Sequence, residues 1–424
     1  MAKRKKKRKL KLGNIFITLG LLVLFILVGI YGKKNLFSAS VDDNRNLLKD
    51  LVEKKDNDNK DKEYVATVIT AGDNLIHSSV YKDAYRLGNY QEYDFKPMYE
   101  LIKPIVSKYN IAYYNQESIL GGTELGLNDY PTFNSPQETG DAMIDAGFNL
   151  VSLATNHTMD SGVSAVLASR EYWNKQKGVL AVGSYSSEEE RNEIHIEKVN
   201  NITYTMLNYT YGTNGIPVPS GKEYLVNVWP TDIDNINDPE RDTEYQEYKK
   251  TVKEDIERVR DKVDVLMVAM HWGVEYTHEP TEYEKDMAKF LASIGVDVII
   301  GAHPHVVQPV TWINDTLVIY SLGNFISAQY QNQGTCTYYK CTTGLMTSFK
   351  ITKTVDGKKS NIKIDSVSNE LIYTYYSGWA NFKVVPFSNE EIVNKLPGYK
   401  EVYNTYKNVV QKYDEDMEVV PAYE

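Results

Sequence analysis

Short apolar segments alternate with amphipathic segments from Tyr64 onward, and this alternation constrains the fold more than any other feature of the sequence. Apolar runs of about four to eight residues bounded by turn residues are typical of strands, and longer amphipathic stretches are typical of helices. The alternation therefore predicts an α/β protein. The expected strands cover residues 64–70, 110–115, 148–153, 179–183, 202–208, 263–270, 296–300 and 317–321.

Two of the expected helices have marked starts. The segment SPQE, which begins at Ser135, combines an N-cap serine, a proline at the first helical position and a glutamate three residues after the cap. The segment TEYE, which begins at Thr281, repeats the capping-box pattern. The first helix should end near Gly147 and the second near Gly295, because glycine readily adopts the left-handed conformation that terminates helices.

The chain changes character after about Tyr330. Strand-like alternation occurs at residues 343–351, 361–364 and 371–376, and a polar tail rich in tyrosine follows. This pattern predicts either a second sheet or a return of strands to the first sheet. We therefore assign residues 64–330 to a main domain and residues 331–424 to C-terminal strands and a polar tail that complete it.

The N-terminus combines a basic cluster with a long apolar run. Residues 1–14 contain eight Lys or Arg and no acidic residue, and the 21 residues from Leu12 to Gly32 carry no charge. At about 1.5 Å per helical residue, this run matches the roughly 30 Å hydrocarbon core of a bilayer. Because basic flanks stay cytoplasmic, the sequence predicts a cytoplasmic segment at 1–14, a transmembrane anchor at 15–32 and an extracellular body in the cell membrane.

A cleaved signal peptide is the alternative interpretation of this segment. Its apolar core would be shorter, about 7–15 residues, and a small-residue cleavage site would follow directly. The segment 38–40, Ser-Ala-Ser, has that composition but lies beyond two lysines, so an uncleaved anchor is favoured. Residues 33–63 are polar and crowded with charge, which predicts a linker between the anchor and the body.

The body of the chain is strongly acidic. After Asn14 there are 39 basic and 57 acidic residues, which gives a net charge of −18. A nucleic-acid-binding protein needs a concentrated basic face, so nucleic acid is not an expected partner.

Cys336 and Cys341 are the only cysteines in the chain. An oxidising exterior would let them pair, and a bridge between them would pin a loop or hairpin. A thiolate metal site would need more Cys or a nearby His, and a catalytic thiol would need an obvious base. Neither pattern is visible, so a structural disulfide is expected.

Five of the expected strands run directly into side chains that can bind a metal. Loops leaving the carboxyl ends of strands in an α/β sheet converge on one edge, so these side chains should lie close together. Four of the seven histidines of the chain are among them. The residues concerned are Asp73, Glu117, Asn156, His157, Asp160, His271, Glu275, His303 and His305.

Each of these residues also has a purely structural interpretation. Asp73 would cap a turn, Glu117 would lie at a rim, and His157 would bond to loop backbone. His303 and His305 are harder to explain in this way, because residues two apart in an extended segment point to one side and reach one centre. Five coincidences together favour a metal site, and mixed carboxylate, amide and imidazole donors suit Zn²⁺, Mn²⁺ or Fe. The other histidines are expected at the surface or in loops: His77, His195 and His278.

The motifs at these strand ends resemble those of a known family. Between Val65 and Phe325 the chain contains, in order, GDN, NQE, ATNHTMDSG, HWGVEY, GAHPHVVQP and IYSLGNF. This set is similar to the capsule-synthesis protein CapA (PgsA) family of poly-γ-glutamate biosynthesis, which is related to the calcineurin-like metallophosphoesterases. The resemblance implies a metallophosphoesterase-like four-layer sandwich, in which two mixed sheets are flanked by helices. It also implies a membrane-anchored protein for synthesis, export or anchoring of a poly-γ-glutamate capsule polymer.

The resemblance further implies a centre for one or two divalent ions. The implied ligands are Asp73 and His305 for one ion, Asn156, His271 and His303 for the other, and Glu117 as the bridge. His157 would be the general acid, oriented by Asp160. One feature departs from the phosphoesterase pattern, which usually begins Asp-x-His, because Leu75 stands two residues after Asp73. The first metal site therefore lacks a ligand, and one-metal or purely structural binding stays open.

Two functions from different classes are compatible with these observations. The first is a membrane-anchored accessory of polyglutamate capsule synthesis, whose partners are the polymer or its membrane synthase complex. The second is an extracytoplasmic metal-dependent phosphoesterase acting on an unknown phosphate ester. Net charge does not separate them, because an acidic body repels both kinds of anion.

Overall fold

The structure is a computed structural model that describes residues 62–228, 243–357 and 359–424. The compact unit considered below comprises Glu63–Val355 and Ser360–Glu424. The expected cytoplasmic segment, the transmembrane anchor and nearly all of the linker lie outside the described residues. Within the described ranges, no helix has both the length and the apolar character needed to cross a membrane.

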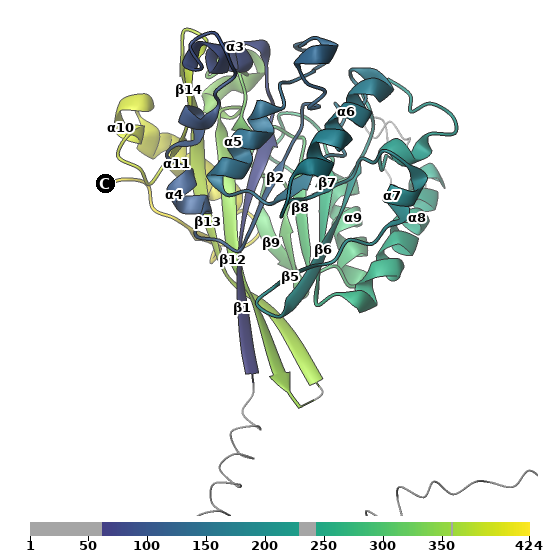
Figure 1. The fold of residues 1–424 in the computed structure, drawn as a ribbon. Helices are drawn as coiled ribbons and strands as arrows, with labels where there is room; N and C mark the ends of the chain where they lie inside the picture. Colours follow the sequence, from purple (N-terminus) through teal and green to yellow (C-terminus); the bar gives the residue numbers. More distant parts are fainter. Residues whose placement is uncertain (1–61, 229–242, 358) are drawn as a thin grey trace, which may run out of the picture. The chain divides into compact units, whose positions relative to one another are not determined.

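The larger sheet has nine strands, and β1 (Lys62–Asn74) lies near its centre. β1 pairs in parallel with β2 (Ile111–Asn115), and the parallel order continues through β3 (Leu150–Ser152) to β4 (Leu180–Val182). The other side of β1 carries strands from the C-terminal part of the chain (Figure 1). These strands are β11 (Asn324–Ile326), β12 (Thr343–Asp356), β13 (Lys359–Ser377), β14 (Ala380–Pro386) and β15 (Glu418–Val419).

The smaller sheet has six strands in the order β5-β6-β7-β8-β10-β9. Its four central strands are parallel, and the two edge pairs are antiparallel. In the larger sheet β13 and β14 are antiparallel, so both sheets are mixed. The strands are β5 (Glu197–Val199), β6 (Ile202–Thr210), β7 (Val265–His271), β8 (Val298–Ala302), β9 (Val310–Ile313) and β10 (Thr316–Ile319).

The two sheets pack face to face because alternate residues of each strand point inward. In β1, Val68 belongs to the core between the sheets, whereas the next residue, Ile69, belongs to the core beneath helices. In β7, Met267 points to the inner core and Val268 to the helices. The result is a four-layer arrangement of helices, sheet, sheet and helices, which fits the metallophosphoesterase-like fold implied by the resemblance.

Helices cover the outer face of each sheet. The larger sheet is covered by α3 (Ser78–Leu87), α4 (Lys103–Val106), α5 (Glu138–Ala146) and α6 (Gly162–Lys175). The smaller sheet is covered by α8 (Thr243–Val259) and α9 (Glu282–Ser293), which lie side by side and join through Tyr245 and Tyr283 (Figure 1). A short helix, α7 (Glu188–Asn192), precedes β5.

All eight strands expected before residue 330 are present, and one of the two helix starts is confirmed. Thr281 caps α9 in a full capping box, in which its hydroxyl and the Glu284 side chain each accept a backbone N–H. The start of α5 was expected at Ser135, and this is wrong, because the helix begins at Glu138. Ser135 belongs to the preceding loop, where its hydroxyl donates to the Ser118 hydroxyl at 2.9 Å. Gly147 ends α5 in the left-handed conformation, as expected.

The C-terminal segment returns to the larger sheet and does not build a separate one. The tail was expected to be polar, but part of it is buried in the core. After α10 (Ile392–Lys395), the helix α11 (Tyr399–Val410) buries Tyr403 and Tyr406 in the core between the sheets. Tyrosine supplies large apolar area with one polar tip, so a tyrosine-rich segment can form core.

The expected disulfide is present. Cys336 and Cys341 are bonded in the loop that precedes β12, and both are buried. The bridge closes a short turn over residues 336–341, which is the structural role that the sequence indicated.

Candidate metal centre

The polar residues that follow the strands meet where the carboxyl ends of the two sheets come together. Asp73 lies at the end of β1, opposite Asn115 of β2 and Asn324 of β11 in register. Gly72, just before it, allows this approach, because a Cβ there would lie 1.8 Å from the carbonyl oxygen of Gly323. From the other sheet, His271 ends β7. The six residues proposed as ligands are all buried: Asp73, Glu117, Asn156, His271, His303 and His305.

One group of possible ligands comprises Asp73, Glu117 and His305. A donor atom from each lies within 4.8 Å of the others. His305 Nδ1 is 3.2 Å from Asp73 Oδ2, and His305 Nε2 is 3.6 Å from Glu117 Oε1. This is the pair Asp73 and His305 that the resemblance implied for one ion, with Glu117 beside them.

A second group comprises Glu117, His271 and His303, again within 4.8 Å of one another. His271 Nε2 is 3.6 Å from Glu117 Oε1 and 2.9 Å from Asn156 Oδ1. Glu117 belongs to both groups, so it occupies the position that a bridging carboxylate would take. The structure thus brings the six residues together, and their role as ligands stays a prediction.

Glu117 provides the test of whether a cation fits here. Both of its carboxylate oxygens are buried and have no hydrogen-bond partner among the described residues. Burial raises the pKa of this carboxyl well above its ordinary value, against the opposing charge of His305. A buried carboxylate is costly without a compensating partner, so a bound cation would satisfy both oxygens.

The imidazoles of the second group are also suited to a metal. Burial, together with neighbouring histidines, lowers the pKa of His271 and of His303 well below the ordinary value. Both rings are therefore neutral near pH 7 and have a lone pair to offer. His303 Nδ1 is buried and has no hydrogen-bond partner in the described ranges. These donors, like Glu117, fit a divalent cation.

His305 behaves differently from its neighbours. Burial lowers its pKa, but the charges of Glu117 and Asp73 outweigh burial and raise the pKa to about 10. The ring is therefore protonated without a metal, and ligation would displace its proton.

The backbone around His303 and His305 corrects one expectation. The two residues were expected to be extended, but their φ angles are +97° and +58°. Both imidazoles still reach the same cluster, with ring centroids 5.8 Å apart. Positive φ is unfavourable for a non-glycine residue, so the surrounding contacts must hold these two residues in place.

Glu275 is a possible ligand that was not assigned from sequence. It forms a third group with His303 and His305, and its Oε1 lies 3.9 Å from His305 Nε2. Its side chain is 42 % exposed, unlike the other donors. The sequence does place Glu275 after β7, in the HWGVE motif. Its distance from the strand end gave no reason to assign it as a ligand.

The missing Asp-x-His histidine has no substitute nearby in sequence. Asn74 turns away from the centre, donating to Gln116 Oε1 at 2.8 Å and accepting from the Tyr99 hydroxyl at 3.0 Å. Leu75 is buried in the protein interior. Glu275 offers the first group an additional carboxylate, with its Oε1 3.9 Å from His305 Nε2.

The two residues proposed for proton transfer lie beside the second group. His157 Nδ1 is 2.6 Å from Asp160 Oδ2, and both side chains are almost fully buried. Asn214 links them to the ligand set, because its amide contacts both His157 Nδ1 and Asn156. Asn214 was not expected from the sequence, since it lies in a loop without a recognisable motif.

Two further asparagines support the centre. Asn115 donates to Asp73 Oδ1 at 2.9 Å, and Asn324 lies 3.0 Å from His305 Nδ1. Both stand in quoted motifs, NQE and LGNF, which is the signal that could have identified them.

The other three histidines have different environments. His77 lies in the loop between β1 and α3, which agrees with the expectation, and there its ring packs edge-on against Phe133 and accepts the Ala328 N–H at 3.2 Å. Burial lowers its pKa to about 4. His278 is half-buried against Tyr406, and the side chain of His195 is 41 % exposed. None of these three belongs to a group of possible metal ligands among the described residues.

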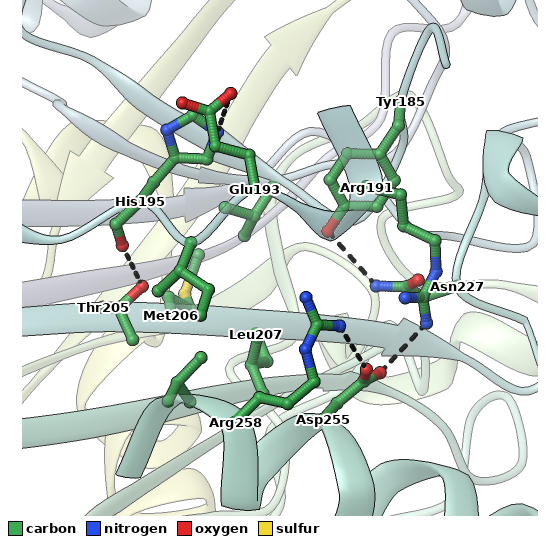
Figure 2. Close-up of a pocket in the computed structure, with 13 residues that line it drawn as sticks. Tyr185, Arg191, Glu193, His195, Thr205, Met206, Leu207, Asn227, Asp255 and Arg258 are labelled. Atoms are coloured by element: carbon green, nitrogen blue, oxygen red, sulfur yellow. Dashed lines mark hydrogen bonds and ion pairs between the residues drawn. The ribbon is translucent and has the colours of Figure 1, made fainter. Parts of the chain in front are cut away.

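A separate cavity of about 40 Å³ lies beside β6 (Figure 2). Arg191 and Arg258 enter it from α7 and α8, and both form ion pairs with Asp255. The lining contains two carboxylates, Asp255 and Glu193, against the two arginines, so this cavity offers little net charge to a ligand. The buried cluster of carboxylates and histidines is the better candidate for chemistry.

The fold and the cluster define a class of protein: an α/β sandwich with a candidate metal centre at the carboxyl ends of both sheets. The family described as bacterial capsule synthesis protein PGA_cap matches residues 67–329. The chain belongs to this family. The match includes all six proposed ligands, from Asp73 to His305.

Two curated relatives are similar to part of the chain. The PGA biosynthesis protein CapA of Bacillus subtilis (strain 168) is 29 % identical over 194 residues, 46 % of each chain. The capsule biosynthesis protein CapA of Bacillus anthracis is 26 % identical over 201 residues, 46 % of this chain and 44 % of the relative. The chain thus spans less than half the length of these curated relatives.

Solved structures show only remote similarity. GAP50, the anchor in the inner membrane complex of Plasmodium, has a TM-score of 0.38 at 9 % identity and covers 85 % of this chain and 98 % of its own. The 5'-nucleotidase from Candida albicans SC5314 has a TM-score of 0.35 at 9 % identity, covering 66 % of this chain and 47 % of its own. Similarity at this level supports no conclusion about function.

Proposed function

We propose that this protein acts in the synthesis, export or anchoring of a poly-γ-glutamate capsule polymer. Membership of the bacterial capsule synthesis family supports this proposal, as do the two relatives named for PGA or capsule biosynthesis. The partners on this view are the polymer itself or its membrane synthase complex. The body after Asn14 carries a net charge of −18, so contact with a polyanion requires local compensation by cations.

The same proposal places the body outside the cell on a single membrane anchor. The support is the uncharged run from Leu12 to Gly32 and the eight basic residues among residues 1–14. The disulfide between Cys336 and Cys341 agrees with an oxidising exterior.

The proposal includes a functional metal centre, and Glu117 is the observation that carries it. Its two buried oxygens lack partners and lie between two histidine-containing groups. Asp73, Glu117 and His305 would hold one divalent ion, and Glu117, His271 and His303 with Asn156 would hold a second. Such ions polarise a bound oxygen and lower the pKa of bound water.

The chain's own residues would orient a substrate and move a proton. Asp160 holds His157 with its Nδ1 toward the carboxylate, which makes Nε2 the nitrogen from which a proton could be donated. Burial of the cluster excludes bulk water and strengthens each of these interactions.

Complementation in the source bacterium tests the proposal. Deletion should abolish the surface polymer, and the wild-type gene should restore it. His271→Ala should fail to restore it, whereas the matched control His195→Ala, at an exposed histidine outside the centre, should succeed. An unchanged capsule after deletion would refute the capsule role.

A second candidate function is an extracytoplasmic metal-dependent phosphoesterase. The observation in its favour is the His157–Asp160 pair next to the second ligand group, the arrangement expected of a general acid. A phosphoester screen of the purified full-length chain with added Mn²⁺ or Zn²⁺ tests it. Turnover that disappears in His157→Ala supports this function, and no turnover on any ester excludes it.

A further inference from the structure

His305 Nδ1 is the ring nitrogen that faces away from Glu117, and Asn324 is the side chain nearest to it. It lies on β11 and is fully buried. Its Oδ1 is 3.0 Å from His305 Nδ1, whereas His305 Nε2 lies 3.6 Å from Glu117 Oε1. The two nitrogens of the ring therefore have different partners, and Nε2 is the one directed at the shared carboxylate.

The orientation of the Asn324 amide is fixed by acceptors on its other side. Its Nδ2 donates to the carbonyl oxygen of Cys341 at 2.7 Å and to Gln329 Oε1 at 2.7 Å. Reversing the amide would place an oxygen against both acceptors. The Oδ1 atom must therefore face His305, where it can only accept, and His305 Nδ1 must donate.

The backbone of Asn324 is held as firmly as its side chain. Asn324 is in register with Asp73 across the β1–β11 pair. Gly344 of β12 packs closely on the other side, since a Cβ there would lie 2.0 Å from the Asn324 carbonyl oxygen. The acceptor for His305 is thus built into the sheet next to a proposed ligand.

Asp73 Oδ2 is the competing acceptor, at 3.2 Å from His305 Nδ1. On the proposed function, Asp73 is itself a ligand, so its oxygens are committed to an ion when the centre is loaded. Asn324 then remains as the neutral acceptor for the Nδ1–H. Among the described residues the other two histidines have no such acceptor: the contact of His271 Nδ1 is the amide nitrogen of Asn115 at 3.5 Å, and His303 Nδ1 has no hydrogen-bond partner.

We propose that Asn324 is a positioning residue for the metal centre: it fixes the His305 imidazole so that Nε2 carries the lone pair offered to the ion. This inference rests on the proposed metal centre. Partners of this kind orient ligating histidines, and their loss typically weakens metal affinity about 10–100-fold.

Calorimetric titration of the metal-free full-length chain with Mn²⁺ or Zn²⁺ tests the proposal. Asn324→Ala should weaken binding of one ion about 10–100-fold. Asn324→Asp retains an acceptor for the Nδ1–H but sets its second oxygen against the Cys341 carbonyl oxygen and Gln329 Oε1, so its affinity should lie between those of wild type and Asn324→Ala. The matched control is Asn369→Ala, which removes an equally buried asparagine bonded to Thr347 and Glu418, outside the groups of possible ligands.

The outcomes separate this inference from the proposed function. A wild-type chain that binds no divalent ion refutes the metal centre, and this inference falls with it. A wild-type chain that binds an ion with an affinity unchanged in Asn324→Ala overturns the positioning role alone. Equal losses in Asn324→Ala and Asn369→Ala overturn it as well, because they would report only general destabilisation.

Gln329→Leu covers the case in which Asn324→Ala does not fold. Gln329 is half-buried, so its replacement disturbs the core less, yet it removes one of the acceptors that hold the Asn324 amide. Its affinity should fall in the same direction but by less than in Asn324→Ala. A folded Gln329→Leu chain with wild-type affinity would contradict the orienting network.

Discussion

His157 and Asp160 form the shortest ion pair at the candidate centre, with His157 Nδ1 2.6 Å from Asp160 Oδ2. The same carboxylate oxygen accepts the backbone N–H of Phe133 at 2.6 Å. The Phe133 ring then packs edge-on against His157, with centroids 4.7 Å apart. Phe133 therefore braces both members of the pair, and the imidazole has one preferred orientation beside the ligand cluster.

This arrangement predicts that His157 and His271 respond differently to substitution. His157→Ala should keep its metal and lose activity or capsule function, because His157 lies beside the ligands and is not in any ligand group. His271→Ala should lower the metal content, measured by elemental analysis of the purified chain. Both variants should retain the wild-type circular dichroism spectrum.

A core variant is the control for this comparison. Ile300→Ala removes a fully buried side chain on β8 and should cost roughly 2–5 kcal/mol of unfolding free energy while leaving the metal content unchanged. If His157→Ala lost metal as completely as His271→Ala, the assigned roles would be wrong. If neither substitution changed the metal content, the cluster would be structural.

Glu117→Gln should separate metal binding from stability. The variant replaces a buried carboxylate that lacks hydrogen-bond partners among the described residues with a neutral amide of the same shape. Its metal-free form should unfold at a higher temperature than metal-free wild type, because burial disfavours the charged form of Glu117 and the amide never carries that charge. Its metal content should be lower, because both ligand groups lose the shared carboxylate. Scanning calorimetry with and without chelator measures both effects, and a wild-type metal content would contradict the bridging role.

The sequence predicted the strands well because burial on both faces makes them continuous apolar runs, as in Val265–His271. It predicted the position of the site because carboxyl ends of parallel strands share an edge. It failed where tertiary contacts decide. Ser135 is bonded to Ser118 instead of capping a helix.

The supporting residues could not be ranked from sequence for a related reason. Asn324 and Glu275 reach His305 from separate parts of the chain, and only the three-dimensional approach of β11 and the loop after β7 brings them together. The backbone conformations of His303 and His305 could not be predicted either. A positive φ can be expected from sequence where glycine stands, but not at a histidine.

Glu190, which lies away from the candidate metal centre, should stabilise the fold in a way that is lost in acid. Burial raises the pKa of its carboxyl, but hydrogen bonds from Ser186 and the charge of Arg170, whose Nη2 is 2.6 Å away, lower the pKa to about 2. A carboxyl whose pKa is lower in the folded state stabilises the fold above its unfolded pKa. This contribution should be lost as the pH falls from about 5 to 2.

Urea unfolding midpoints at pH 6 and pH 3 measure the effect. Wild type should lose more stability between these pH values than Glu190→Gln, which has no proton to gain. Glu188→Gln, at an exposed position in the same helix, is the matched control and should behave as wild type. Identical pH dependence in all three chains would show that the Arg170–Glu190 pair carries no such linkage.

The membrane anchor predicts which side of the membrane the body occupies. Protease added to intact cells should digest the chain beyond about Lys33, because the basic residues of 1–14 are expected to remain cytoplasmic. The fragment that survives should contain the N-terminal basic segment. Protection of the body in intact cells would overturn the extracellular assignment.

The disulfide should contribute modestly to stability. Cys336 and Cys341 close a loop with a sequence separation of only 5, and chain-entropy arguments give about 2 kcal/mol for so short a loop. The Cys336→Ser/Cys341→Ser double variant should therefore unfold at a slightly lower urea concentration than the oxidised wild type, with the same slope. Reduced wild type is the control and should match the double variant. A much larger loss would mean that the turn over residues 336–341 stabilises parts of the fold beyond its own loop. The metal affinity should then fall as well, because the Cys341 carbonyl oxygen accepts a hydrogen bond from Asn324.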